Sequence, residues 1–310
     1  MRLVVYSTLP SAARTQLVQG LPAGVEVTYA QDLAAEEQAA ACQSAEVIMG
    51  NPPPEWLASP LPQLRLWQLD SAGFDRYQGL AVSAPVANMG DYFAWPCAET
   101  MVAGLLALYR AVPELARLQA EARWVGAPIR GRMGLLRDKR VIILGAGTIA
   151  QAVRQQLSGF TQAVRLLART NPQAQLHSVA ELRVALPDTD IVVNCLPGSA
   201  DNFFGEPEFA ALAPGGFYAT VGRGNTTNEP ALLAALQSGH LAGAVLDVTT
   251  QEPLPASHPF WAMPQVLLTQ HTGGGQPHEA AGKVAQLLRN VALLQAGQPL
   301  ENLVELGRGY

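Results

Sequence analysis

Three charged residues in the C-terminal half of the chain are of the types that reduction of a 2-keto acid requires. Arg223 lies in TVGRGN, Glu252 in LDVTTQEPLP and His271 in LLTQHTGGG. An arginine can hold a carboxylate through paired hydrogen bonds, a histidine can donate a proton near neutral pH, and a glutamate beside that histidine can keep the imidazole charged. Taken singly, each residue has an equally simple interpretation: a surface ion-pair partner, a solvated loop acid and a hydrogen-bonded structural histidine.

A glycine-rich turn in VIILGAGTIAQAV has the form of a dinucleotide-binding turn. A strand-like run leads into Gly145-Ala-Gly147-Thr-Ile-Ala150, and a helix-like segment follows. Gly145 permits a tight turn, Gly147 lets a pyrophosphate approach the helix N-terminus, and Ala150 still allows the helix to pack closely on the strand. This strand–turn–helix context predicts a Rossmann-type nucleotide site.

The end of the following strand indicates which dinucleotide is bound. Units that bind NAD carry an acidic residue about 20 residues beyond the glycines, where it holds the ribose 2′-hydroxyl. Here the strand ends in Leu-Leu-Ala-Arg169-Thr170, and no acidic residue occurs between Asp138 and Glu181. Arg169 and Thr170 can instead bind a 2′-phosphate, which favours NADP(H) over NAD(H). The alternative is that Arg169 is a solvated loop residue and that backbone groups alone hold the ribose.

Strand-like runs precede these residues, and they alternate with helix-like segments along the whole chain. In the first ninety residues the expected strands are 3–7, 25–30, 46–51, 65–70 and 85–89, with a helix around 33–43. A long apolar helix over 98–119 leads to a second set, with strands at 140–145, 163–168, 190–196, 215–221, 242–248 and 265–270 and helices at 148–157, 179–185, 205–212, 229–238 and 276–296. This alternation predicts an α/β protein with two doubly wound parallel-sheet domains.

The composition excludes several other classes of protein. Of the 310 residues, 49% are hydrophobic and 15% are charged, which is incompatible with intrinsic disorder. No apolar run reaches the roughly 18 residues of a membrane span, and the N-terminal segment lacks a signal-peptide layout, so we expect a cytoplasmic protein without a membrane partner. Three widely spaced cysteines, and five histidines without metal-ligand spacing, predict neither a disulfide framework nor a metal site.

A basic block within this acidic protein points to an anionic ligand. Residues 122–180 hold nine Arg or Lys and one acid, Asp138, whereas the whole chain has a net charge of -5. The alternatives are a nucleic-acid-binding face and a set of solvated arginines. Because the block lacks interleaved aromatic residues and any recognition motif, no nucleic-acid partner is expected. The phosphate groups of a dinucleotide are the expected anions.

The order of the motifs resembles that of a known family. SAGFD (71–75), LGAGTIA (144–150), CLP (195–197), GRG (222–224) with Glu229, LDV…EPLP (246–255) and TQHTGGG (269–275) look like the D-isomer-specific 2-hydroxyacid dehydrogenases, in the right order and over almost the whole chain. The length, the ART ending at 168–170 and the terminal GRGY further resemble the NADP-preferring glyoxylate/hydroxypyruvate reductases. The resemblance implies NAD(P)H-dependent reduction of a small 2-keto acid of the glyoxylate or hydroxypyruvate type to the D-2-hydroxy acid.

The resemblance also implies roles for the matched positions. Arg223 would bind the substrate carboxylate, His271 would donate the proton, Glu252 would be the partner of that histidine, and Asp247 would lie on the nicotinamide side. The implied backbone contacts to the carboxylate are Ser71, Ala72 and Gly73, and the implied cofactor contacts are Gly145, Gly147, Thr148, Ile149, Arg169, Thr170, Cys195, Leu196, Pro197, Val221, Gly222, Asp247 and Gly273.

In that family the cofactor domain is inserted into the substrate domain. For this chain the resemblance implies a flavodoxin-like substrate domain of residues 1–95 plus 276–310 and a Rossmann cofactor domain of residues 96–275. It also implies an active site in the cleft between the domains, closed by a hinge, and a homodimer formed through the apolar helix. That helix offers more apolar surface than one sheet face needs, through Met101, Val102, Leu105, Leu106, Leu108 and Tyr109.

The sequence departs from the family pattern at three places. Gln270 stands where a proline usually precedes the catalytic histidine, Thr220 replaces an asparagine near the start of the RG motif, and Cys97-Ala98-Glu99 replaces a VAE segment. These changes concern loop shape and cofactor contacts, so they preserve the reaction class but leave the exact keto acid open. Trp95 and Phe74 are candidates either for shaping the substrate pocket or for packing.

A non-catalytic nucleotide-sensing scaffold of the same fold is the alternative function. Such a protein would bind the cofactor without consuming it, and it would not need Arg223, Glu252 and His271 in register. Because all three residues are present, we expect an enzyme.

Overall fold

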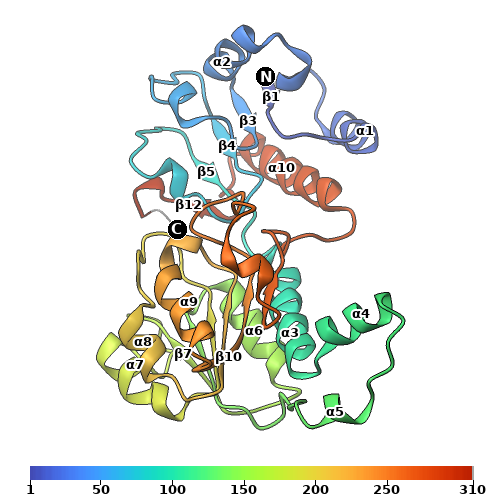
Figure 1. Ribbon diagram of the computed structural model, residues 1–310. Helices are drawn as coiled ribbons and strands as arrows, with labels where there is room; N and C mark the ends of the chain where they lie inside the picture. Colours follow the sequence, from blue (N-terminus) through green and yellow to red (C-terminus); the bar gives the residue numbers. More distant parts are fainter. Residues whose placement is uncertain (309–310) are drawn as a thin grey trace. The chain divides into compact units, whose positions relative to one another are not determined.

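The computed structural model describes residues 1–308, and the chain divides into two compact units (Figure 1). Unit 1 consists of Met1–Tyr92 and of the chain from Gln276 onward, and unit 2 is Phe93–Gly275. The first boundary follows Tyr92, three residues before the end expected at residue 95. Gly309 and Tyr310, which complete the GRGY end, lie outside the described residues.

Unit 1 contains a six-stranded sheet in the order β12-β5-β4-β3-β1-β2. Its strands are β1 Arg2–Val5, β2 Glu26–Tyr29, β3 Val47–Met49, β4 Leu66–Gln68, β5 Val86–Ala87 and β12 Leu303–Val304. The order β2-β1-β3-β4-β5 of the parallel strands is that of flavodoxin-like sheets, with a reversal between β1 and β3. β12 pairs antiparallel with β5, so this sheet carries one antiparallel edge strand that the expected parallel sheet lacked.

Helices and loops cover both faces of this sheet, because successive residues of a strand point to opposite sides. The helices of unit 1 are α1 Ser11–Gly20, α2 Ala35–Ser44 and α10 Glu279–Gln295. Leu3 and Val5 of β1 belong to the core under α1 and α10, which lie side by side in Figure 1. Val4 belongs to the core on the other face, with α2 and the fully buried Trp67 and Tyr77.

Unit 2 contains a parallel six-stranded sheet in the order β11-β10-β9-β8-β6-β7. Its strands are β6 Val141–Leu144, β7 Val164–Leu167, β8 Ile191–Asn194, β9 Gly216–Thr220, β10 Leu241–Leu246 and β11 Val266–Leu268. A single parallel bridge between Leu167 and Leu176 lies where a third strand would stand beside β7. With this bridge counted, the order is that of Rossmann sheets and reverses between β6 and β8. The predicted fold class, an α/β protein with two doubly wound sheets, is confirmed.

The helices of unit 2 are also divided between the two faces of their sheet. They are α3 Ala94–Tyr109, α4 Val112–Ala120, α5 Ala127–Arg130, α6 Thr148–Leu157, α7 Val179–Ala185, α8 Glu206–Ala211 and α9 Glu229–Gln237. Val141 and Ile143 of β6 pack in the core with α3 and α6, whereas Ile142 and Leu144 pack in the core with α7, α8 and α9. Every strand of this sheet is therefore held from both sides, and its carboxyl-terminal loops are left to form a site.

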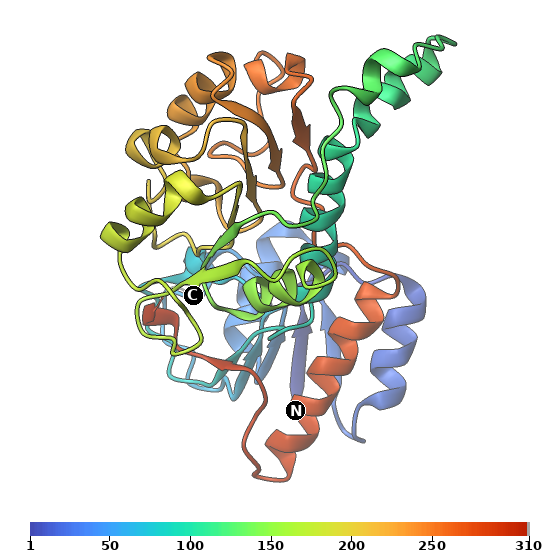
Figure 2. The same cartoon turned by 90° about the horizontal axis from the view of Figure 1, so that it is seen from below.

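The helix expected over 98–119 is interrupted. α3 ends at Tyr109, Ala111 adopts a left-handed φ of 55°, and α4 begins at Val112. Pro113 explains the break, because a proline ring lacks the N–H of a helical hydrogen bond and clashes with the carbonyl four residues earlier. Figures 1 and 2 show α4 and α5 projecting away from the sheet of unit 2.

Most of the apolar side of α3, on which the dimer argument from the sequence rested, packs inside unit 2. Met101 and Leu105 are fully buried, and Val102 and Tyr109 are nearly so, all within the core of unit 2. Leu106 and Leu108 are only partly buried against this core. α3 thus uses most of its apolar surface against its own sheet and α6, and the expected homodimer stays a prediction.

α1 falls between the first two strands, where a helix-like stretch was expected without stated bounds, and it buries only Ala13 and Leu17. Two short elements were not expected: α5, with four residues, and β12, with two. Among residues 1–308, no helix combines the length and the apolar character that crossing a bilayer requires.

Candidate active site

The glycine turn joins β6 to α6 at the point where the strand order of unit 2 reverses. Gly145 has a φ of 104°, a conformation that residues with a side chain rarely adopt. A Cβ placed on Gly147 would meet no atom of the described chain within 4 Å, so the space before the helix is open. No side chain of the described chain caps α6, and its first N–H groups can bind an anion. The turn therefore fits the pyrophosphate of a dinucleotide.

The loop after β7 lies beside this turn. The Asn171 amide donates a hydrogen bond to the Ala146 carbonyl (Nδ2–O 3.3 Å), which joins the two loops. Arg169 and Thr170 are exposed, and Arg169 forms no ion pair with any residue between 1 and 308. An unpaired guanidinium next to the glycine turn suits the 2′-phosphate of NADP(H).

Other members of the basic block are engaged in ion pairs. Arg132 pairs with Glu114 at 2.7 Å, and Arg140 pairs with Asp188 and Asp190, both at 3.1 Å. Arg123 pairs with Glu121 and Arg137 with Asp138. The block is thus partly a set of surface ion pairs, and Arg169 is the member placed beside the glycine turn.

The loops after β8 and β9 touch each other. A Cβ on Gly222 would come 2.2 Å from the Leu196 carbonyl oxygen, so only glycine allows this approach. The Cys195 amide donates to the Leu144 carbonyl at the end of β6 (3.0 Å). Two segments implied as cofactor contacts, 195–197 and 221–222, are thereby brought together next to the strand that carries the glycine turn.

A buried hydrogen-bond network holds the backbone of Arg223. Thr226 Oγ1 donates to the Arg223 carbonyl at 2.6 Å and accepts from Asn194 Nδ2 at 2.8 Å. Asn194 Nδ2 also donates to the Tyr218 hydroxyl at 2.8 Å, and Asn194, Tyr218 and Thr226 are all fully buried. The Arg223 side chain donates to the Gly222 carbonyl at 2.9 Å. The network fixes the loop from which this half-buried arginine projects.

His271 and Glu252 form a direct pair. His271 Nδ1 lies 2.6 Å from Glu252 Oε2, and Glu252 Oε1 accepts a hydrogen bond of 3.0 Å from the Thr249 amide. Because a carboxylate only accepts, the imidazole carries a proton on Nδ1, and Nε2 is left for a substrate. The histidine side chain is 53% exposed, which leaves it accessible. The two residues follow the neighbouring strands β10 and β11, and Arg223 follows β9 on the other side of β10.

The backbone at His271 has an unusual conformation. Gln270 and His271 have φ values of 53° and 55°, in the left-handed region that non-glycine residues seldom occupy. The His271 amide donates to the Asp247 carbonyl at 2.6 Å, which helps to hold this conformation. Proline locks φ near -65°, so the usual proline could not occupy position 270 in this conformation. The glutamine at position 270 is therefore compatible with this backbone conformation, and a proline is not.

The Asp247 carboxylate holds the loop after β11 through several hydrogen bonds. Its Oδ1 atom accepts from Thr269 Oγ1 at 2.6 Å, the Thr272 amide at 3.1 Å and the Gly273 amide at 3.0 Å, and its side chain is buried. The implied contacts Asp247 and Gly273 thus lie together. The carboxylate orders the segment that carries His271.

In unit 1, the SAG segment has a backbone suited to an anion. The Ser71 carbonyl accepts from the Met89 amide (3.1 Å), the Ala72 carbonyl from Asn88 Nδ2 (2.6 Å) and the Gly73 carbonyl from Ser71 Oγ (2.7 Å). Within the described part of the chain, the three N–H groups of 71–73 donate to no acceptor. Carbonyls that are engaged and amides that are free favour a carboxylate over a cation.

Sequence reasoning missed the asparagines that support these loops. Asn51 donates through Nδ2 to Ser71 Oγ (3.0 Å), Asn88 holds Ala72, and Asn194 holds the Arg223 loop. Each follows or ends a strand, which was the available signal.

Phe74 is buried in the core of unit 1, whereas Trp95 is 48% exposed. Burial raises the pKa of Cys97, in the segment that replaces VAE, to about 12.

A family profile described as D-isomer specific 2-hydroxyacid dehydrogenase, NAD binding domain, matches residues 102–273. The chain is 33% identical over 239 residues to a glyoxylate/hydroxypyruvate reductase A of Serratia proteamaculans (strain 568), an alignment that covers 74% of each protein. It is 30% identical over 279 residues to a glyoxylate/hydroxypyruvate reductase A of Yersinia enterocolitica, covering 85% of this chain and 87% of that relative. A crystal structure of a D-isomer specific 2-hydroxyacid dehydrogenase from Xanthobacter autotrophicus Py2, in complex with NADPH and MES, is similar with a TM-score of 0.81 and 27% identity, covering 100% of this chain and 99% of that chain.

Proposed function

The chain belongs to the D-isomer specific 2-hydroxyacid dehydrogenase family, and we propose that this NAD(P)-dependent oxidoreductase reduces glyoxylate or hydroxypyruvate to the D-2-hydroxy acid. The His271–Glu252 pair is the observation that carries the proposal, because it provides an oriented proton donor at the carboxyl edge of the nucleotide-binding sheet. The names of the Serratia and Yersinia relatives supply the two keto acids. A sensing scaffold would have no use for an oriented proton donor, so the catalytic reading is favoured.

Arg223, His271 and Glu252 would each have a separate role in the reduction of the keto acid. When bound, the dihydronicotinamide cofactor supplies the hydride that the carbonyl carbon accepts. Arg223 binds the substrate carboxylate. His271 Nε2 gives its proton to the carbonyl oxygen as negative charge develops there. Glu252 holds the imidazole through Nδ1 and stabilises its charged form, while the Thr249 amide fixes the carboxylate.

Substitution of His271 by glutamine tests this assignment. Glutamine keeps polarity and approximate size but cannot donate a proton as an acid, so kcat/KM for glyoxylate should fall by about 10²–10⁴. A matched control is His240→Gln, whose Nε2 bonds the Leu212 carbonyl (2.9 Å) away from the site, and which should keep its activity. An unaltered kcat/KM for correctly folded His271→Gln would refute the role.

We propose NADP(H) as the preferred cofactor, with NAD(H) also accepted. The residues support this through the open space at Gly147, the uncapped N-terminus of α6 and the guanidinium of Arg169 beside the turn. The remaining implied cofactor contacts, at 195–197, 221–222, Asp247 and Gly273, line the ends of neighbouring strands of the same sheet. The Xanthobacter structure, which is named as a complex with NADPH, agrees with this choice.

We also propose that the chain forms a homodimer through the projecting segment 112–135 rather than through α3. Exposed apolar side chains gather there: Val112 (48%), Leu115 (40%), Trp124 (98%) and Leu135 (60%). A monomer gains nothing from a tryptophan that is almost wholly in water, whereas buried aromatic residues dominate the energetics of interfaces.

A cytoplasmic location is proposed as well, in keeping with three cysteines that are all free.

A further inference from the structure

A second glutamate lies beside the loop that carries Glu252. Glu229 is the first residue of α9, and the Asn228 side chain caps this helix by accepting from the Ala231 amide at 3.0 Å. Because α9 follows β9, its first turn lies at the carboxyl edge of the sheet of unit 2, as the Glu252 loop does. The Glu229 side chain is only 16% exposed, and none of the steps proposed for the reduction uses it.

Glu229 holds one peptide group of the Glu252 loop. Its Oε1 atom accepts a hydrogen bond from the Thr250 amide. The carbonyl of the same peptide group, which belongs to Thr249, lies against Gly224: a Cβ on this glycine would come 2.0 Å from the Thr249 oxygen. The peptide group is therefore held from both sides, by contact with the loop after β9 and by a charge-assisted hydrogen bond to a carboxylate.

This peptide group adjoins the groups that orient Glu252. The Thr249 amide donates to Glu252 Oε1 at 3.0 Å, and Thr249 Oγ1 donates to the Gln251 carbonyl at 2.8 Å. The other carboxylate oxygen of Glu252 lies 2.6 Å from His271 Nδ1. A shift of the 249–250 peptide group would move the Thr249 amide, and with it the carboxylate that faces the imidazole.

The second oxygen of Glu229 faces His258. His258 Nδ1 accepts from the Phe260 amide at 3.3 Å, so in the neutral ring the proton is on Nε2. This Nε2 atom lies 4.0 Å from Glu229 Oε2. Each oxygen of Glu229 thus has a donor group on its side, which favours one orientation of the carboxylate.

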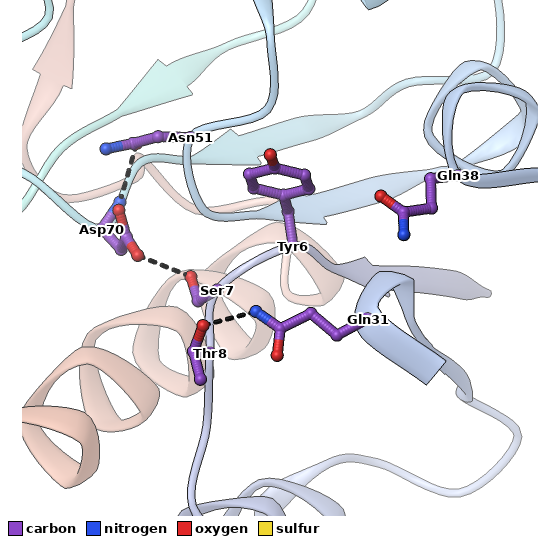
Figure 3. Close-up of a pocket in the computed structure, with 7 residues that line it drawn as sticks. All are labelled: Tyr6, Ser7, Thr8, Gln31, Gln38, Asn51 and Asp70. Atoms are coloured by element: carbon purple, nitrogen blue, oxygen red, sulfur yellow. Dashed lines mark hydrogen bonds between the residues drawn. The ribbon is translucent and has the colours of Figure 1, made fainter. Parts of the chain in front are cut away.

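Unit 1 fixes the loops at the carboxyl edge of its own sheet in a similar way. Asp70 Oδ2 accepts from Ser7 Oγ at 2.7 Å, and the Asp70 amide donates to Asn51 Oδ1 at 3.3 Å (Figure 3). These bonds join the loops after β1, β3 and β4. In unit 2 the corresponding bond, from Thr250 to Glu229, supports the loop of the acid–base pair.

We propose that Glu229 is a positioning residue for the Glu252–His271 pair. Its carboxylate fixes the 249–250 peptide group, so that Glu252 stays on Nδ1 of His271 and Nε2 is left for the proton transfer. The inference rests on the proposed function, because it adds a residue to the machinery of that reaction. Glu229 acts through the loop and not by contact with the reacting atoms.

Two substitutions of Glu229 test this role. Glu229→Ala removes the acceptor of the Thr250 amide, whereas Glu229→Gln keeps an oxygen that can accept from it. With NADPH and glyoxylate, Glu229→Ala should lower kcat about tenfold, a part of the 10²–10⁴ that a positioned proton donor contributes, and leave KM for NADPH unchanged. Glu229→Gln should restore most of kcat.

Asp190→Ala is the matched control. The Asp190 carboxylate also accepts from a backbone amide, that of Arg140 at 2.8 Å, and its side chain is 24% exposed. Asp190 precedes β8 and therefore lies at the amino edge of the sheet, opposite the Glu252 loop. Asp190→Ala should lower Tm, as Glu229→Ala does, but keep kcat, which separates positioning from a loss of stability.

The tautomer of His271 gives a measurement that needs no turnover. In alkaline buffer, where the imidazole is neutral, the ring-nitrogen NMR shifts of the wild type should show the proton on Nδ1, because the Glu252 carboxylate can only accept. His271→Gln identifies the signals by their loss. Glu229→Ala should move the proton to Nε2, the position that free histidine favours, whereas Glu229→Gln and Asp190→Ala should not.

The two measurements separate the positioning role from the proposed reaction. If the tautomer changes as expected but the wild type reduces no keto acid, the positioning role stands and the proposed reaction is refuted. If the wild type reduces glyoxylate and Glu229→Ala leaves the tautomer unchanged, the reaction stands and the positioning role is refuted. An equal loss of kcat in Asp190→Ala, or no recovery in Glu229→Gln, would also overturn the positioning role.

Discussion

Replacement of Thr226 by valine tests whether the buried network positions Arg223. Thr226 is fully buried, and its hydroxyl links Asn194 Nδ2 (2.8 Å) to the Arg223 carbonyl (2.6 Å). Valine has nearly the same shape, so the change removes these two hydrogen bonds without creating a cavity. One N–H of Asn194 loses its buried partner, and the Arg223 carbonyl keeps only the hydrogen bond from the Thr226 backbone amide (3.1 Å).

The expected magnitudes follow from this geometry. A buried group left without its partner costs about 1–3 kcal/mol. For a domain of about 150–250 residues, each 1 kcal/mol lowers Tm by about 2–4 °C, so Tm should fall by about 2–12 °C. If the loop then spends most of its time away from the binding position, KM for the keto acid should rise about tenfold, which corresponds to about 1.4 kcal/mol. KM for NADPH should not change.

Thermal unfolding and steady-state kinetics measure both effects, and Thr189→Val is the control. Thr189 is also fully buried, and its hydroxyl donates to the Ala185 carbonyl (2.8 Å) at the end of α7, away from Arg223. This variant should lose stability and keep its KM for the keto acid. Thr226→Ser should restore the wild-type KM, because it restores the hydroxyl. If Thr226→Val lowers Tm but leaves KM for the keto acid at the wild-type value, the network does not position Arg223.

Three further predictions concern the cofactor, the assembly and the thiols. Arg169→Ala should raise KM for NADPH about tenfold or more and leave KM for NADH unchanged, because only NADPH carries the 2′-phosphate. Arg137→Ala serves as the control. Equal kcat/KM of the wild type with NADPH and NADH would contradict the assignment of Arg169 to the 2′-phosphate. Trp124→Ser should raise the dimer dissociation constant about 30-fold or more in sedimentation experiments, whereas a wild-type mass of 32.9 kDa at micromolar concentration would exclude the dimer. Burial raises the pKa of Cys42 to about 11 and of Cys97 to about 12. Iodoacetamide at pH 8 should therefore alkylate both thiols only after the protein is unfolded in guanidinium. Rapid labelling of the native protein, measured by mass spectrometry, would show that these thiols are not protected.

Most of the fold was predictable because parallel strands that are covered on both faces appear as apolar runs. Each of the eleven strands expected from such runs has a counterpart, and α6 and α7 have the expected bounds of 148–157 and 179–185. The elements that were missed lack this signal: α5 has four residues and buries only Ile129, and β12 has two residues and exists through its pairing with β5. Pro113 signalled the helix break in the sequence, but the apolar pattern around it led to the prediction of one continuous helix over 98–119.

For the site, residue types and their order after the strands were enough to select Arg223, Glu252 and His271. Their role as a catalytic set remains a prediction, but the contact between Glu252 and His271 is a tertiary fact. It depends on the adjacency of β10 and β11 and on the left-handed backbone at His271. Spacing along the chain specifies neither feature, since both require the whole sheet to be assembled.

The sequence alone determined the class of the protein, because the glycine turn, its strand–helix context and the ordered charged motifs are local features that physical chemistry restricts to few uses. Tertiary structure decided which groups are free to act. Arg169 stands beside the glycine turn while other arginines of the basic block are paired. The carbonyls of 71–73 accept hydrogen bonds while their N–H groups meet no acceptor in the described chain. Most of the apolar side of α3 is buried while Trp124 is exposed. Whether a group is free, paired or buried depends on its neighbours in space, and residues distant in the sequence supply those neighbours.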